Sequence, residues 1–377
     1  MHFNPKVGKL PAILLLIAIP GAARAQLDNT VFEDRQSLAA ADSGKLFFDL
    51  GFLGFSKNNE YFDTIIEGYT LLGYQLHPSL GYYARKNVRL AAGAYLQQDF
   101  GNRGFSTVVP TLSLKITKGP MALVFGNIEG SLGHRLIEPL YGFERVLNHR
   151  LETGIQLKSM TENLFFDLWL DWQNTIYNND PGQERFVSGL SVQKKILKKA
   201  AFEISIPVQV LIAHRGGQIN ISHEPLETLM NSAVGAEVQK HGTGWMKAWK
   251  VNGFYAYYKD VTATYGRPYL DGSGFYANAT MSMAFGLDVM ASYWQAHEFL
   301  SIQGGNIYPS VSEFDYRVQR ENMQLAIVRL LYNREIAKGL AATLRVEPYY
   351  DLGFNSFQYS YGFYLQFKDR FFLAKRK

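Results

Sequence analysis

Apolar and polar residues alternate along most of the chain, in segments of about 10 to 14 residues between positions 45 and 368. In the segment 202–212 every even-numbered residue is apolar, whereas Glu203, Ser205 and Gln209 lie on the opposite face. The segments 164–172 and 358–367 repeat this pattern. A period of two predicts β-strands with one apolar and one polar face. Soluble strands usually have about five or six residues, whereas strands that cross a bilayer need roughly 9 to 11, so the lengths favour membrane-spanning strands.

About sixteen such segments fit between residues 44 and 368, and weak alternation in 248–258 and 320–332 leaves fourteen open. The connections between them alternate in length. Short ones fall at 84–87, 118–119, 159–162 and 195–199, and long ones at 58–67, 132–148, 213–230, 259–272 and 297–319. This alternation predicts an antiparallel transmembrane β-barrel with short periplasmic turns and long outer loops. A soluble all-β protein is the alternative, but it gives no reason for alternating loop lengths.

The N-terminus has the features of a targeting segment. Lys6 and Lys9 precede an apolar run from Leu10 to Ile19, and Ala23-Arg24-Ala25 supplies small residues at a cleavage site. The run is shorter than the roughly 20 residues that a spanning helix needs, so the sequence predicts a cleavable signal peptide and export. The predicted organisation is a signal peptide at 1–25, a short periplasmic segment at 26–43, the barrel at 44–368 and a basic tail at 369–377.

Composition narrows the chemistry. The chain has no cysteine, which excludes disulfides, thiolate metal sites and a cysteine nucleophile. The net charge of +5 is too diffuse to indicate nucleic-acid binding. It is unevenly placed, however: the predicted inner turns hold twelve Lys and Arg against two Asp and Glu, and the outer connections hold nine against sixteen. A basic inner rim is suited to anionic lipid headgroups.

The signal peptide, the absence of cysteine, the alternating strands and the aromatic ending Tyr361-Gly362-Phe363-Tyr364-Leu365-Gln366-Phe367 together resemble Gram-negative outer-membrane β-barrels, porins in particular. The ending departs from the usual form because ten residues follow Phe367. The resemblance implies that the third outer loop, 132–149, folds inward and narrows a water-filled pore. Its charged residues Arg135, Glu138, Glu144 and Arg145 are then expected to form the constriction, because rings of charge select among solutes.

We therefore expect an outer-membrane, porin-like channel for passive diffusion of small polar solutes, with no enzymatic activity, no cofactor and no metal. The sequence leaves open whether the barrel forms a homo-oligomer. One alternative is a non-conducting barrel that binds a polysaccharide or protein through its outer loops. Another is a barrel lipid hydrolase using Ser131 and His134, which stand three residues apart. The segment from His297 to Ser301 fails the zinc-binding H-E-x-x-H pattern.

Overall fold

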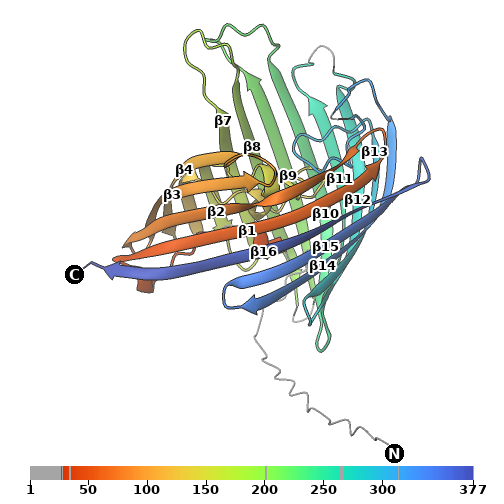
Figure 1. The fold of residues 1–377 in the computed structure, drawn as a ribbon. Coiled ribbons are helices and arrows are strands. Elements are labelled where there is room, and N and C mark those ends of the chain that lie inside the picture. Colours follow the sequence, from red (N-terminus) through yellow and green to blue (C-terminus); the bar gives the residue numbers. More distant parts are fainter. Residues whose placement is uncertain are drawn as a thin grey trace, which may run out of the picture.

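The computed structural model describes residues 27, 29–33, 35–199, 202–263, 267–312 and 314–376. The predicted signal peptide, 1–25, lies outside the described residues. The described chain forms one closed barrel of sixteen antiparallel strands, in which each strand pairs with its neighbours in sequence and β1 pairs with β16 (Figure 1). The fold prediction is confirmed, and sixteen is the correct strand number.

The strands run as follows: β1 Lys45–Phe62, β2 Glu67–Arg85, β3 Val88–Asp99, β4 Thr107–Lys118, β5 Met121–Asn127, β6 Thr153–Met160, β7 Leu164–Asn174, β8 Glu184–Lys198, β9 Phe202–Gly216, β10 Glu227–His241, β11 Met246–Asp260, β12 Asp271–Met283, β13 Leu287–His297, β14 Asn322–Ala337, β15 Leu340–Asp351 and β16 Ser356–Lys375. The described residues also contain the short helices η1 Asn29–Phe32, η2 Ala40–Asp42, η3 Ser131–His134 and α1 Arg145–Asn148. No helix within the described ranges is long and apolar enough to cross a membrane.

Alternation decides which side chains face the lumen. In β9, Glu203, Ser205 and Gln209 are buried inside the barrel, whereas Ile206 and Val208 are exposed on the outer wall. The strands that alternate weakly in sequence, β11 and β14, nevertheless pair with both neighbours, with register shifts at Met246/Ala248 and Glu335/Ala337. Their backbone hydrogen bonds close the ring regardless of side-chain pattern, which is why the fourteen-strand alternative fails.

Several predicted boundaries differ from the observed ones. The connection between β1 and β2 is only 63–66, because both strands extend into the predicted loop 58–67. At the other end, β16 continues to Lys375, so most of the predicted basic tail 369–377 is strand paired with β1. Polar and charged residues pair as strand here because β1 offers them a backbone partner, which alternation in sequence does not reveal.

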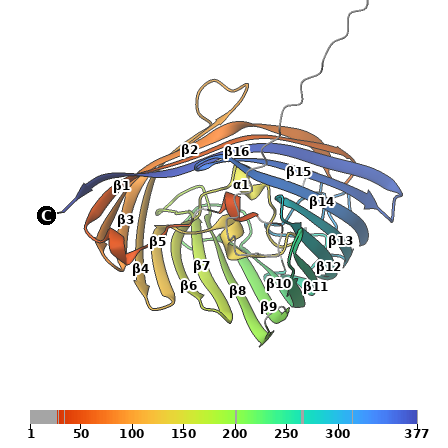
Figure 2. The ribbon, with the colours of Figure 1, turned by 90° about the horizontal axis from the view of Figure 1, so that it is seen from below.

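The lumen is filled by chain segments. Figure 2 shows α1 and the N-terminal η1 inside the ring of strands. Phe32 of η1 is 2% exposed and its ring packs edge-on against Phe143 and Tyr364, at centroid distances of 5.1 and 5.2 Å. The segment 26–43 was predicted to be periplasmic, but this described part of it lies within the barrel, where burial of aromatic surface holds it.

Candidate functional site

The connection from β5 to β6, residues 128–152, crosses the interior of the barrel. Gln75 of β2 donates hydrogen bonds to the carbonyls of Val146 and Leu147, at 3.0 and 2.9 Å. On the far side, Gln209 of β9 donates to the carbonyl of Arg135 at 3.0 Å. Contacts to both walls place this loop within the lumen, at the position from which a constriction would act.

The two predicted constriction carboxylates bind cations of the wall. Glu138 contacts Arg329 of β14 at 2.5 Å and Arg345 of β15 at 2.7 Å. Burial alone would raise the pKa of Glu138, but the two guanidinium groups hold it well below its usual range. Glu144 contacts Lys57 of β1 at 2.5 Å. These carboxylates therefore anchor the loop to three strands.

The two predicted constriction arginines lie over aromatic rings. The guanidinium of Arg135 is 4.0 Å from the ring centroid of Phe165, and that of Arg145 is 4.9 Å from Tyr141. Arg135 and Glu138 both line a cavity of about 390 Å³. The loop thus brings two of the four predicted residues together at one cavity, and their role in solute selection stays a prediction.

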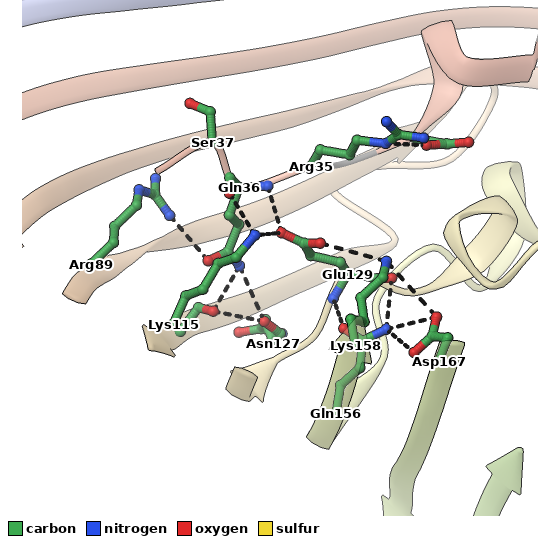
Figure 3. Close-up of polar contacts among 12 residues, drawn as sticks. Arg35, Gln36, Ser37, Arg89, Lys115, Asn127, Glu129, Gln156, Lys158 and Asp167 are labelled. Atoms are coloured by element: carbon green, nitrogen blue, oxygen red, sulfur yellow. Dashed lines mark hydrogen bonds and ion pairs between the residues drawn. The ribbon is translucent and has the colours of Figure 1, made fainter. Parts of the chain in front are cut away.

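A polar cluster connects this loop to the N-terminal segment (Figure 3). Glu129 contacts Lys115 of β4 at 2.5 Å and Lys158 of β6 at 3.5 Å, and it accepts a hydrogen bond from the backbone N–H of Gln36 at 2.9 Å. Lys158 also lies 3.8 Å from Asp167 of β7. The cluster explains how a segment without strand partners is held in the lumen.

The structure does not support Ser131 and His134 as a catalytic pair. His134 is fully buried, its Nδ1 lies 3.0 Å from Asp167 and its Nε2 lies 2.7 Å from Glu152. Its ring stacks on Trp169 at a centroid distance of 3.6 Å. Both ring nitrogens are thus occupied by carboxylates, and none is left to take a proton from Ser131. This histidine fixes the loop to the wall.

A different serine and histidine stand opposite one another on the outside of the wall. Ser273 of β12 stands directly opposite His297 of β13, and His297 stands directly opposite Asn322 of β14. Directly opposed side chains have Cβ atoms about 4.5 to 5.5 Å apart. His297 Nδ1 is 3.1 Å from the Asn322 side-chain oxygen. When Nδ1 donates to that oxygen, Nε2 is free to act as a base, which is the order of groups that activates a hydroxyl nucleophile.

This row lies where the polar rim meets the apolar wall. It occupies the ends of strands on the side of the long connections, and β12 begins two residues before Ser273. The next outward-facing residue of β12, Phe275, is 47% exposed, and its register partner Tyr255 is 55% exposed. Ser273 therefore lies at the boundary between the polar rim and the apolar outer wall.

Acidic side chains flank the row formed by Ser273, His297 and Asn322. Glu321 is 3.7 Å from His297 Nδ1, and its side chain is 62% exposed. The ligand atoms of His297, Glu298 and Glu321 lie within 4.8 Å of one another, so the three side chains are close enough to coordinate one cation.

Sequence reasoning missed this row, although the chain carries a signal for it. A tight turn centred at 285 pairs residues whose numbers sum to 570, and Ser273 and His297 satisfy that sum. Both residues also continue the outward-facing alternation of their strands. Pairing the two strands about this turn therefore places Ser273 opposite His297. The sequence analysis instead selected Ser131 and His134 as a catalytic pair because they are close in the sequence.

Comparison with protein-family models shows which family the chain belongs to. Residues 38–376 match the model of the family described as lipid A 3'-O-deacylase-type. The chain belongs to this family. The expectation that the protein has no enzymatic activity was therefore wrong, because the lipid A 3'-O-deacylase-type family is described by an enzymatic activity. A search of curated proteins gave no match.

Solved structures resemble this member of the lipid A 3'-O-deacylase-type family in fold. The outer membrane protein OprD from Pseudomonas aeruginosa is 12% identical with a TM-score of 0.52, and the match covers 89% of this chain and 97% of that one. OmpT of Vibrio cholerae, in-vitro folded and in trimer form, is 8% identical with a TM-score of 0.52, covering 86% and 100%. Acinetobacter baumannii OccAB4 is 11% identical with a TM-score of 0.50, covering 87% and 99%. These likenesses confirm the porin-like, outer-membrane type of barrel.

Proposed function

We propose that the protein hydrolyses an acyl ester of a lipid A-type glycolipid at the outer rim of its wall. Ser273 is the nucleophile, His297 the general base and Asn322 the group that orients the imidazole. The observation that carries the proposal is the register that aligns these three residues on the lipid-facing surface. The family description supplies the substrate class.

The proposed reaction has two steps. The Ser273 oxygen attacks the ester carbonyl while His297 Nε2 takes its proton, and the sugar oxygen leaves with that proton as the C–O bond breaks. Water then attacks the acyl-serine, again giving a proton to His297, and releases the fatty acid while Ser273 recovers its hydroxyl. The products are one free fatty acid and a glycolipid with one acyl chain fewer.

The test is mass spectrometry of lipid A after incubation with the refolded protein. The wild type is expected to release one acyl chain. Ser273→Ala is expected to remove this activity, and His297→Gln to lower it by roughly 10² to 10⁴-fold. Ser131→Ala is the matched control, since that serine lies inside the lumen, and it is expected to keep full activity. An active Ser273→Ala variant would overturn the assignment.

A second candidate function is passive diffusion of small polar solutes through the lumen. The observation that favours it is the cavity of about 390 Å³ lined by Arg135 and Glu138, together with polar residues of β8 to β12. If solutes pass there, planar bilayers should show stable current steps, and Arg135→Glu should shift ion selectivity toward cations. Folded wild-type protein that gives no steps would reject this function and leave hydrolysis untouched.

A further inference from the structure

The end of the barrel with the short turns carries exposed cations that have no counter-charge. We define the basic rim as six of them: Arg85 at the end of β2, Lys86 in the β2–β3 turn, Lys118 at the end of β4, Arg334 and Lys338 around the β14–β15 turn, and Lys375 at the end of β16. Within the described residues, none of the six side chains makes an ion pair. At the opposite end, two exposed cations are paired, Lys259 with Asp271 and Arg317 with Asp315.

These six residues form one continuous arc. Around the ring, β14 is followed by β15, β16, β1, β2, β3, β4 and β5. The three turns and the end of β16 are therefore successive features of the same side of the barrel. One acidic residue of the arc, Glu335, uses its carboxylate to accept a hydrogen bond from the backbone N–H of Gly339 at 3.1 Å. The arc as a whole repels cations and attracts anions.

Apolar side chains adjoin the arc on the outer wall. Ile336 is 56% exposed and stands between Arg334 and Lys338. Phe371 of β16 is 43% exposed, and its ring centroid lies 6.2 Å from that of Phe48 on β1. Long cationic side chains beside an apolar surface extend their charged ends toward the water while their stems contact lipid. This combination suits a ligand that has an anionic head and apolar tails.

We infer that the basic rim binds anionic phospholipid headgroups in the leaflet at the short-turn end of the barrel. A soluble polyanion would bind through the cationic side chains alone and would make no use of the apolar Ile336, Phe48 and Phe371. A lipid engages both parts, because its phosphate lies at the level of the cations and its chains lie along the wall. This surface is at the opposite end from Ser273, so the inference does not depend on the proposed hydrolysis.

The experiment uses spin-labelled lipids with the refolded full-length protein in phosphatidylcholine vesicles. Electron spin resonance gives the fraction of labelled lipid that the protein immobilises. The wild type is expected to prefer spin-labelled phosphatidylglycerol over phosphatidylcholine several-fold. Replacing all six basic-rim residues by glutamine is expected to bring that ratio close to one, as is raising the salt concentration to about 1 M, where the screening length is near 3 Å.

A matched variant replaces four exposed cations at the other end, Arg103→Gln, Arg185→Gln, Lys259→Gln and Arg317→Gln, and is expected to retain the preference. Heat-modifiable migration on gels verifies that each variant is folded. A wild-type ratio near one, or an undiminished ratio in the six-residue variant, would refute the inference. Retention of isolated peptidoglycan in place of phosphatidylglycerol selectivity would also refute it and assign the rim to a different polyanion.

Discussion

His134 shows how a single residue couples the lumen loop to pH. Burial alone would lower its pKa, but Glu152 and Asp167 outweigh burial and raise the pKa to about 9. Free imidazole titrates near 6.5, so the charged form stabilises the folded state fully below that pH, and this contribution is lost as the pH rises through about 9. Between pH 7 and 10, the urea midpoint of the wild type should fall more steeply than that of His134→Gln. Equal slopes for the two proteins would contradict this role.

The residue scale is also where sequence reasoning was least reliable. Ser131 and His134 are neighbours in the chain, yet the fold gives both imidazole nitrogens to carboxylates. Ser273 and His297 are 24 positions apart, yet strand register makes them opposite one another. Chemistry depends on which side chains meet across strands, and in a barrel this is set by turn position more than by spacing in the sequence.

Among the elements, the β5–β6 loop depends on Glu138 for its attachment to β14 and β15. Arg329 and Arg345 are each about 1% exposed, so removing the negative charge leaves buried cations with reduced compensation. Glu138→Gln is expected to lower the free energy of unfolding by on the order of 3 kcal/mol. Glu347 also contacts Arg345 and still neutralises part of its charge in the variant. The expected loss of unfolding free energy is therefore at the lower end of the range for a broken buried ion pair. Equilibrium urea unfolding measures the change.

The control for this prediction is Glu335→Gln, because Glu335 is an exposed carboxylate near the end of β14. Its removal is expected to change the free energy of unfolding by less than about 0.5 kcal/mol. If both variants lost the same stability, the loop would not be held by its buried ion pairs.

Elements were predicted well where one physical rule governs them. A strand with lipid on one face and polar groups on the other must alternate, so β7, β9 and β16 could be identified from sequence. Strand ends could not, because β16 gains its last residues from pairing with β1, up to Lys375 opposite Lys45. The inward course of residues 29–32 also left no periodic signal, since it rests on aromatic contacts such as Phe32 with Tyr364.

At the scale of the whole molecule, three segments share the lumen. The N-terminal segment and the β5–β6 loop meet through Glu129 and Gln36, and the β13–β14 connection joins them where Tyr308 donates a hydrogen bond to Glu138 at 3.1 Å. A barrel of sixteen strands is wide enough to hold water when its interior is empty. If solutes pass through this barrel, the segments that fill its lumen limit the passage, and removing one of them tests that arrangement directly.

Replacing residues 130–150 by a short Gly-Ser linker is the sharpest such change. The flanking pairs Gly126–Gly154 and Asn127–Thr153 already bring β5 and β6 together, so a short connection can close the hairpin without breaking the ring. The variant is expected to give current steps in planar bilayers several-fold larger than those of the wild type, because the loop no longer crosses the lumen. It is also expected to keep ester hydrolysis, since Ser273 and His297 lie outside the wall. Enlarged steps with intact hydrolysis would separate the two functions physically, whereas unchanged steps would mean that the loop does not limit passage through the barrel.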